Sequence, residues 1–481
     1  MSPRKVPVSE IAQHNRPEDI WIIVDGQVYD LTTFAPSHPG GSDIIYRYAG
    51  RDASNEYNQV HSPSLIRDTL EPQQFIGSVD EPTLENDSKT TSHATSHSLH
   101  PKPPLHQILN LHDFQDIAQQ TLSRKSWAFI HGAANDNITR DANQELLRRI
   151  WLRPAVMRDV TAVTTATTLF GCQLSMPVYI APTGAARMAG PEGELGLAQA
   201  AGATGVIQCI ATPSSPHREI LDATRRHAFF QLYVNKDREA SAAMIRDVTG
   251  VRGKQIAAIL VTADLPVVSK READERIKTE GGPVLVGGAT VASNGDRKGA
   301  GLARQASAMI DPGLCWDDLR WLRGITDLPI VVKGIQRAED ARMALRLGCD
   351  GIVVSNHGGR EADTAPPAIL TLLELQRNCP EVFRGMEVLV DGGFRRGSDV
   401  VKAICLGASA VGLGRPVLYA LGYGQEGVEH ALEIIRDEVK TTMRLCGMAD
   451  LMRDAHPGYT NTRQIDHLVM QEEPRRRVDK L

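Results

Sequence analysis

Eight short apolar runs, each followed by a stretch of helical character, constrain the fold of this chain most. The runs are rich in Val, Ile and Leu, and they cover residues 178–182, 206–210, 229–234, 257–264, 329–334, 351–356, 387–393 and 410–415. Continuous apolar strands separated by helices indicate a parallel sheet that is covered on both faces. Eight of them predict a closed (β/α)8 barrel, an α/β fold. An open doubly wound sheet fits less well, because no GxGxxG motif opens the first strand–helix turn.

The chain has 481 residues, which is more than one ordinary core holds, and its composition divides it. We expect an N-terminal domain, a linker, the barrel domain and a C-terminal tail, over residues 5–79, 80–104, 105–462 and 463–481. The linker is polar and rich in Ser, Thr, Pro and His, so it cannot bury a core and we expect it to be mobile. The crossover between Asp264 and Pro329 is long and Gly-rich, which is typical of a lid or a disordered excursion.

Charge and cysteine usage exclude several classes of protein. A net charge of −5 gives no basic field for nucleic acid. No run of 18 or more apolar residues is present, so we expect no membrane span. The seven cysteines are scattered and form no CxxC pair, which indicates a reduced compartment and neither a disulfide framework nor a zinc site.

The N-terminal region carries two histidines about twenty residues apart, which taken alone would more often be surface residues. His38 lies in FAPSHPGGSDII and His61 in NQVHSP, and the preceding WIIVDGQVYDLTTF predicts a hairpin with a DG turn. A six-coordinate haem needs two neutral imidazoles on opposite faces of the ring. Residues 6–79 resemble the cytochrome b5 family. The resemblance implies a small α+β domain in which His38 and His61 are the axial ligands of one haem b, and which carries electrons without binding oxygen.

Three motifs after the later runs are highly specific together. SNHGGREAD follows the sixth run, DGGFRRGSDVVKAICLG the seventh and GLGRP the eighth, where a barrel places its active site. Residues 106–450 resemble the family of FMN-dependent 2-hydroxy-acid oxidases and dehydrogenases. With the haem domain in front, the whole chain resembles the fungal flavocytochromes of that family, which pass electrons from lactate to cytochrome c. The resemblance implies FMN and haem b as cofactors, cytochrome c or another one-electron acceptor as partner, and a homotetramer. The compartment stays open between the cytoplasm and, by resemblance, the mitochondrial intermembrane space.

The polar residues after the strands suit the oxidation of a 2-hydroxy acid, which needs a base, a carboxylate clamp and an electron sink. His357 can take the proton, because imidazole titrates near neutral pH, and Asp264 can orient that ring. Arg360 offers a planar fork for a carboxylate. We further expect three supporting roles. Lys333 places positive charge at the flavin N1/O2 edge, Tyr233 donates a hydrogen bond to the substrate, and Arg271 is a second cation for the substrate.

The cofactor contacts follow from the same barrel geometry. Phosphate binds after strands seven and eight of such barrels, where this chain has Gly393, Arg395, Gly414 and Arg415. We expect the isoalloxazine and ribityl groups to contact polar residues at other strand ends: Gln231, Thr262, Ser355 and Asp391. The family resemblance adds main-chain contacts from Thr183 and Gly184. Each of these residues alone is more often structural, and it is their joint placement after different strands that indicates function.

Two positions depart from the family. The family commonly has two tyrosines where SWAFIHGAANDNIT has Phe129 and Ile130, and the first usually donates its hydroxyl to the substrate carboxylate. Phe129 cannot, and a hydrogen bond to a charged group is worth about 1.5–3 kcal/mol. Apolar burial of a larger side chain can restore the affinity that this hydrogen bond would have given. The expected substrate is therefore lactate or a larger analogue. A serine often found after strand two is also absent, and Ile210 or Ala211 stands there.

Three functions remain open on the sequence alone. The first is a dehydrogenase that passes electrons through its own haem to cytochrome c. The second is an oxidase that uses oxygen, with which a Gly184 that opens space near flavin N5 is compatible. The third is a non-enzymatic redox module on a degenerate barrel, which the intact His357, Arg360, Asp264 and Lys333 argue against.

Overall fold

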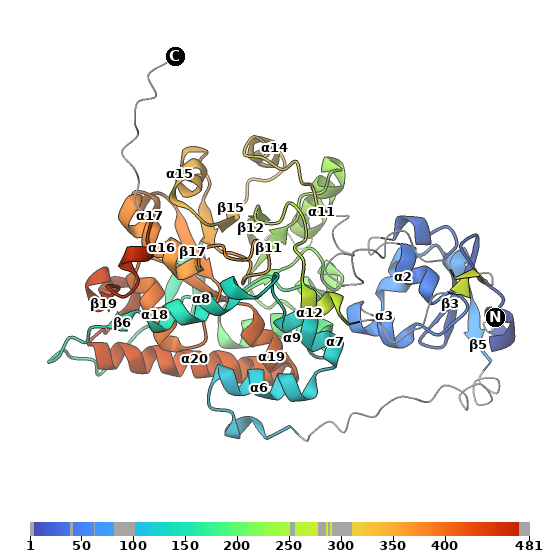
Figure 1. Ribbon diagram of the computed structural model, residues 1–481, viewed down its shortest axis with the longest axis horizontal. Helices are drawn as coiled ribbons and strands as arrows, with labels where there is room; N and C mark the ends of the chain where they lie inside the picture. Colours follow the sequence, from blue (N-terminus) through green and yellow to red (C-terminus); the bar gives the residue numbers. More distant parts are fainter. Residues whose placement is uncertain are drawn as a thin grey trace, which may run out of the picture.

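A computed structural model of the chain shows an N-terminal domain beside a larger barrel domain (Figure 1). It describes residues 4–38, 42–61, 63–80, 102–250, 255–277, 285–286, 289–290 and 310–470. Within these residues no helix is both long enough and apolar enough to cross a membrane.

The N-terminal domain is a five-stranded sheet with short helices packed on it. The sheet order is β1-β5-β4-β3-β2, with bounds Lys5–Val6, Phe75–Val79, Gln27–Asp30, Asp19–Val24 and Asn15–Arg16. Strands β3 and β4 form the predicted hairpin, and its turn residues Asp25 and Gly26 have φ of 51° and 72°. Two positive φ values are the mark of a type I′ turn, for which Asp-Gly is a preferred pair. The helices are α1 (Val8–Ile11), α2 (Ser42–Arg47), α3 (Ser54–Val60) and α4 (Leu65–Thr69).

The eight predicted runs form a closed barrel of parallel strands. The order is β10-β11-β12-β15-β16-β17-β18-β9, and β18 pairs with β9 to close it. The strands in chain order are β9 (Val178–Ile180), β10 (Ile207–Ile210), β11 (Ala228–Leu232), β12 (Ile256–Thr262), β15 (Ile330–Ile335), β16 (Gly351–Val354), β17 (Glu387–Asp391) and β18 (Ala410–Leu413). The (β/α)8 prediction is confirmed, and the chain is an α/β barrel preceded by a small α+β domain.

Helices surround the barrel and bury the outer face of its strands. They include α9 (Gly193–Thr204), α10 (His217–Ala223), α11 (Arg238–Gly250), α14 (Asp318–Arg323), α15 (Ala338–Arg346), α16 (Ala368–Asn378), α18 (Gly397–Cys405), α19 (Arg415–Leu421) and α20 (Gly424–Cys446). Neighbouring strand residues face opposite sides: Val331 belongs to the inner cluster with Tyr179 and Phe229, whereas Val332 belongs to the outer one. The barrel interior is therefore a packed core, and chemistry is confined to the C-terminal ends of the strands.

Three helices before the barrel, α6 (Leu111–Thr121), α7 (Arg124–His131) and α8 (Ile138–Arg148), pack on the same domain. The long crossover contains α12 (Glu272–Glu275) and the two-residue pair β13 (Leu285–Val286) and β14 (Ala289–Thr290). Most of its Gly-rich part lies outside the described residues, as do linker residues 81–101 and tail residues 471–481. Ile465 and Val469 are buried in the barrel domain's core, so its packing continues past residue 462.

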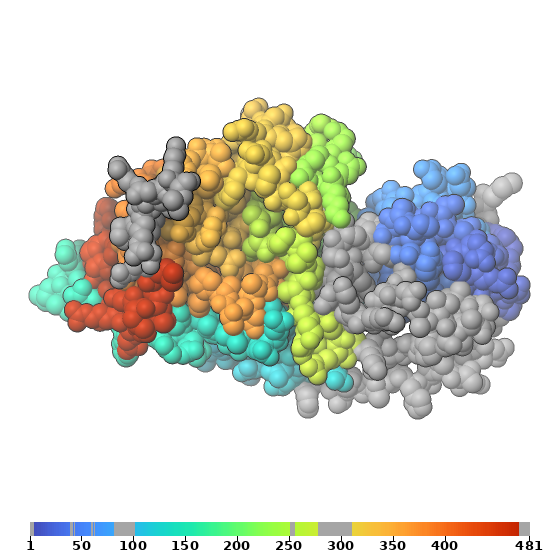
Figure 2. All heavy atoms as spheres, turned by 45° about the horizontal axis from the view of Figure 1, so that its top comes forward, coloured from blue at the N-terminus to red at the C-terminus, as the bar shows by residue number. Residues whose placement is uncertain are grey.

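The two domains touch through the segment that carries His61. Helix α3 packs against η4 (Ala186–Met188), where Arg187 Nε donates to the carbonyl of Asn58 at 3.3 Å. Ser64 Oγ also donates to the Glu219 carboxylate of α10. Figure 2 shows the N-terminal residues as a lobe of their own beside the body of the barrel domain.

Candidate active site

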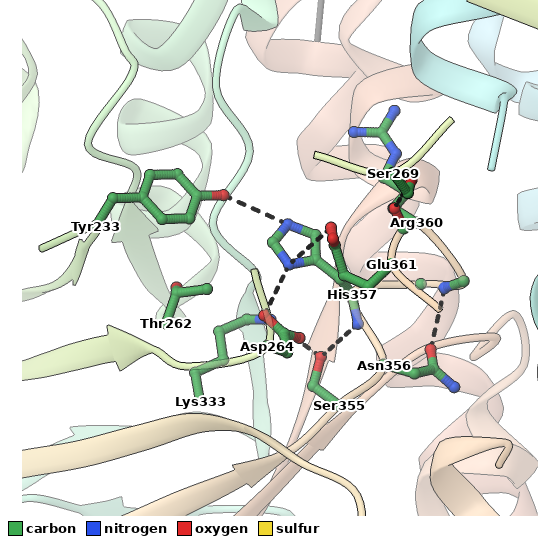
Figure 3. Close-up of polar contacts among 12 residues, drawn as sticks. Tyr233, Thr262, Asp264, Ser269, Lys333, Ser355, Asn356, His357, Arg360 and Glu361 are labelled. Atoms are coloured by element: carbon green, nitrogen blue, oxygen red, sulfur yellow. Dashed lines mark hydrogen bonds and ion pairs between the residues drawn. The ribbon is translucent and has the colours of Figure 1, made fainter. Parts of the chain in front are cut away.

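His357 lies on a strained turn directly after β16. Its φ is +56°, and Gly358 and Gly359 follow at +67° and +77°. A positive φ is unusual for a residue with a side chain and persists only where the surroundings enforce it. Here Ser355 Oγ accepts a hydrogen bond from the His357 amide at 3.1 Å. The turn places the imidazole at the C-terminal mouth of the barrel, among residues from several strands (Figure 3).

The imidazole is held by a carboxylate at one nitrogen and faces a phenol at the other. His357 Nδ1 lies 3.1 Å from Asp264 Oδ1, and Nε2 lies 3.5 Å from the Tyr233 hydroxyl. Burial lowers the pKa of His357 and outweighs the opposing pull of Asp264, so the ring is neutral at neutral pH. Burial alone would raise the pKa of Asp264, but His357 and Lys333 outweigh it and the pKa lies below its ordinary value. A neutral base beside a fixed carboxylate suits proton abstraction at Nε2.

Lys333, at the end of β15, is held as a buried cation. Its Nζ lies 3.0 Å from Ser355 Oγ and 3.5 Å from Asp391 Oδ2, and Ser355 Oγ donates to Asp391 Oδ1 at 2.6 Å. Burial would lower the pKa of Lys333, but Asp391 and Asp264 outweigh it and raise the pKa. On the neighbouring strands, Gln231 Nε2 donates to Thr262 Oγ1 at 2.9 Å.

Arg271, which is buried, and Arg360, which is partly buried, stand at the mouth with unsatisfied Nε donors. Arg360 donates from Nη2 to the carbonyls of Phe129 and Ile130, and its guanidinium lies 5.4 Å from the centre of the Phe129 ring. The Nε atoms of Arg360 and Arg271 are buried without a hydrogen-bond partner. Burial, followed by repulsion from Arg271 and Arg415, holds the pKa of Arg360 well below its ordinary value. Such a pair of guanidinium groups fits a bound carboxylate.

A second region of uncompensated positive charge lies after β17 and β18. Burial and neighbouring arginines lower the pKa of Arg415 to about 10 and that of His131 to about 4, and burial also lowers that of Arg395. Across the described parts of the chain, no carboxylate forms an ion pair with Arg360, Arg395 or Arg415. The Arg395 Nε and Thr183 Oγ1 atoms are buried without a partner. Buried polar atoms are normally satisfied, so these residues fit a phosphate-bearing cofactor such as FMN.

The two histidines of the N-terminal domain face one another at the separation a haem requires. The ring centres of His38 and His61 are 6.1 Å apart, and the rings are nearly perpendicular at 84°. Two metal–imidazole bonds of about 2 Å each place two ring centres roughly 6 Å apart. Burial and repulsion from His38 lower the pKa of His61 to about 4, which keeps it neutral, as an iron ligand must be. The pair therefore fits haem b.

Comparison with known proteins agrees with this geometry. Residues 118–458 match the family described as FMN-dependent dehydrogenase. The chain belongs to this family. Residues 7–80 match the family described as cytochrome b5-like haem/steroid binding domain. The cofactors of this two-domain dehydrogenase are FMN and haem b.

Relatives share either both domains or the barrel alone. An L-lactate dehydrogenase (cytochrome) of Wickerhamomyces anomalus is 38% identical over 465 residues, covering 95% of this chain and 79% of that protein. A peroxisomal (S)-2-hydroxy-acid oxidase of Oryza sativa subsp. japonica is 40% identical over 343 residues, covering 70% of this chain and 92% of that protein. The structure of a flavocytochrome b2 variant with benzoylformate superposes with a TM-score of 0.69 and 36% identity, covering 79% of this chain and 93% of that one.

The backbone at Gly184 packs closely on the next strand's loop. A Cβ at Gly184 would lie 2.2 Å from the Pro213 carbonyl oxygen, so a larger residue does not fit here. Thr212 follows Ile210 and Ala211, where the family often has a serine. Thr212 Oγ1 donates to the Gln231 carbonyl at 2.7 Å and accepts from the Tyr233 amide at 3.0 Å, which ties β11 to this loop.

Sequence reasoning missed residues that act from outside the motifs. Asn143 of α8 and Asn356 exchange two side-chain hydrogen bonds of 2.9 Å, which pin the loop that carries His357. Glu361 lies buried beside His357 (Figure 3). Asn143 gives no sequence signal, since an asparagine in a helix is usually exposed. Glu361 could have been noticed as a carboxyl inside the SNHGGREAD motif.

Proposed function

We propose that this dehydrogenase oxidises an L-2-hydroxy acid to the 2-oxo acid and delivers the electrons through haem b to cytochrome c or another one-electron acceptor. One observation carries the proposal. A neutral His357 backed by Asp264 shares one barrel mouth with Arg271, Arg360 and the Lys333 cation, in a chain that also holds a paired-histidine domain. The Wickerhamomyces relative is named for lactate and cytochrome.

Each residue at the barrel mouth has a separate role in the proposed reaction. Arg360 and Arg271 hold the substrate carboxylate, and their unpartnered Nε donors become satisfied. His357 takes a proton at Nε2, and Asp264 at Nδ1 balances the charge that forms. Lys333 fixes positive charge at the end of β15, where the flavin pyrimidine edge is expected. FMN held beside Lys333 would supply a two-electron acceptor for the substrate, and haem b held between His38 and His61 would supply a one-electron carrier.

The side chain at position 129 favours an analogue larger than lactate. Phe129 offers no hydroxyl to a substrate carboxylate, and its ring lies over Arg360. A larger apolar substrate gains burial against such a ring, by roughly 25 cal/mol for each Å² removed from water. The neighbouring structure that holds benzoylformate shows that this fold accommodates a phenyl group in a flavocytochrome b2 variant.

We also propose that the dehydrogenase assembles as a homotetramer. Val156 and Met157 are 81% and 99% exposed, and Trp151 nearby is 60% exposed. Apolar side chains gathered on one segment favour contact between copies. Light scattering of the purified protein tests this assembly.

A panel of substrates and acceptors tests the function. The purified holoenzyme is mixed with L-lactate, glycolate, L-2-hydroxyisocaproate and L-mandelate, with either cytochrome c or oxygen as acceptor. We expect flavin bleaching to precede haem reduction in stopped-flow spectra, with cytochrome c reduced faster than oxygen. Oxygen consumption with no haem reduction would support the oxidase instead, and no flavin bleaching with any acid would overturn the proposal.

A further inference from the structure

Glu361 is a second carboxyl at the active site that the proposed mechanism does not use. It follows Arg360 in the loop after β16, and its side chain is 7% exposed. Its Oε1 lies 3.8 Å from His357 Nδ1 and 3.6 Å from Arg271 Nη2. Oε1 is buried without a hydrogen-bond partner. Both distances are longer than the length of a charge-assisted hydrogen bond, about 2.7–2.9 Å. Neither His357 nor Arg271 therefore forms a hydrogen bond with Glu361 Oε1.

Charged groups surround Glu361 from four elements. Arg271 at the start of α12 and Arg360 beside it in the loop carry positive charge, as does Lys333 of β15. Asp264, after β12, carries negative charge, and His357 is neutral at neutral pH. Burial raises the pKa of Glu361 to about 9, because it outweighs the attraction of Arg271 and Arg360 and is reinforced by Asp264. Below that pH the side chain is a neutral acid, and above it a carboxylate.

We propose that Glu361 is a positioning residue that controls, through Arg271, how firmly the site holds a carboxylate. As a neutral acid, Glu361 leaves the charge of Arg271 uncompensated and available to the substrate. Once its proton is released to solvent, the Glu361 carboxylate pairs with Arg271 and repels an anionic substrate. The inference rests on the proposed function in one respect, that Arg271 faces a substrate carboxylate.

The consequence is a loss of anion affinity on the alkaline side. If anion binding requires the protonated form, linkage makes the dissociation constant rise about tenfold for each pH unit above the pKa of Glu361. Glu361→Gln keeps the shape of the neutral acid and cannot ionise, so this loss should vanish. Glu272→Gln is the matched control. Glu272 lies next to Arg271 on α12 but forms surface ion pairs with Lys270 and Arg276.

Calorimetric titration of the oxidised holoenzyme with pyruvate tests the proposal without turnover, because pyruvate stays ionised from pH 7 to 10. We expect wild type and Glu272→Gln to bind about tenfold more weakly at pH 10 than at pH 8, and Glu361→Gln to bind equally at both. KM and kcat for the best 2-hydroxy acid are measured in parallel, with the alkaline effect expected in KM. If Glu361→Gln does not accumulate as holoenzyme, the Glu361→Met variant takes its place in the titration, because methionine also removes the ionisable acid.

Each outcome decides the question. The same alkaline loss in wild type and in Glu361→Gln would overturn the inference, as would a flat wild-type profile or no pyruvate binding at any pH. An alkaline loss that Glu361→Gln abolishes supports it even if no 2-hydroxy acid is oxidised. In that case the proposed function fails and the role of Glu361 in anion binding stands.

Discussion

At the scale of single residues, the chemistry depends on which nitrogen of His357 is occupied. Nδ1 is held by Asp264 at 3.1 Å, and Nε2 faces Tyr233 at the mouth of the barrel. The positive φ of His357 is the local cost of this orientation, and Ser355 and the Asn143–Asn356 pair sustain it. The nitrogen that faces the barrel mouth is therefore set by the loop after β16 and by the Asp264 carboxylate after β12.

Replacing the base should stop the chemical step. A positioned general base contributes about 10²–10⁴-fold to the rate, so His357→Gln should slow flavin reduction by substrate by at least the lower figure. The measurement is anaerobic stopped-flow absorbance, with FMN and haem content checked by spectrum. His430→Gln, which removes another partly buried imidazole that contacts the Ile108 carbonyl, is the control. Flavin reduction at near wild-type speed in His357→Gln would contradict the assignment.

The pKa of His357 sets the acid side of the pH profile. A base must be unprotonated, so activity is present above its pKa and is lost as pH falls through it. Burial lowers the pKa of His357 below 6.5, so kcat/KM should hold until the pH falls below 6.5. Asp264→Asn removes the charge that opposes this shift and should move the acid limb to still lower pH. A limb that moved upward in that variant would contradict the pairing.

At the scale of elements, the strands of the barrel were predictable from sequence, whereas several residues that loops and preceding helices bring to the active site were not. Each strand of the barrel is a short, largely buried apolar run, a pattern that depends on local sequence alone. Residues that end strands, such as Lys333 and Thr262, fall into place once the barrel is assumed. The burial of Glu361 and the pairing of Asn143 with Asn356 depend on how loops and preceding helices close over the mouth, which no local pattern encodes.

Helix α7 carries Phe129, the ring that we propose shapes the substrate preference. Arg360 donates to the carbonyl of Phe129 and its guanidinium lies over that ring. Phe129→Tyr should lower KM for small acids such as glycolate and lactate, by about tenfold or more if the new hydroxyl gains a charge-assisted hydrogen bond of about 1.5–3 kcal/mol. KM values across the acid panel measure this, with Phe129→Leu as the control that adds no hydroxyl. An equal fall in KM for small and large acids would point to a general change in the pocket.

The two proposed haem ligands lie at the ends of two short helical elements. His38 follows η1 (Ala35–Ser37) and His61 follows α3, so each imidazole leaves its backbone at a C-terminal cap. Substituting either with Ala should abolish the low-spin haem spectrum while FMN stays bound, because one remaining ligand cannot fill both axial positions. Absorbance of the purified variants checks this, and His14→Ala, in the same domain, is the control. An unchanged haem spectrum in either variant would remove that histidine from the iron.

At the scale of the whole molecule, the contact between α3 and η4 lies between the two proposed cofactor sites. Thr183 and Gly184, where the flavin is expected, lead directly into η4, and Arg187 of η4 donates to the Asn58 carbonyl. Asn58 lies three residues before His61 on α3. The segment that carries a proposed iron ligand therefore packs on the segment that follows the proposed flavin site, which is the arrangement an internal electron relay needs.

Removing this contact should separate the two half-reactions. A hydrogen bond from a charged donor is worth about 1.5–3 kcal/mol, so Arg187→Ala should reduce the docked population and slow haem reduction by about tenfold. Flavin reduction should keep its wild-type rate, because Arg187 touches neither His357 nor the arginines of the mouth. Stopped-flow absorbance resolves both steps in one experiment. Arg218→Ala, which removes an exposed arginine paired with Asp247 on the adjacent α10, is the matched control and should change neither. Equal slowing of both steps in Arg187→Ala would mean that the contact supports the barrel and not the relay.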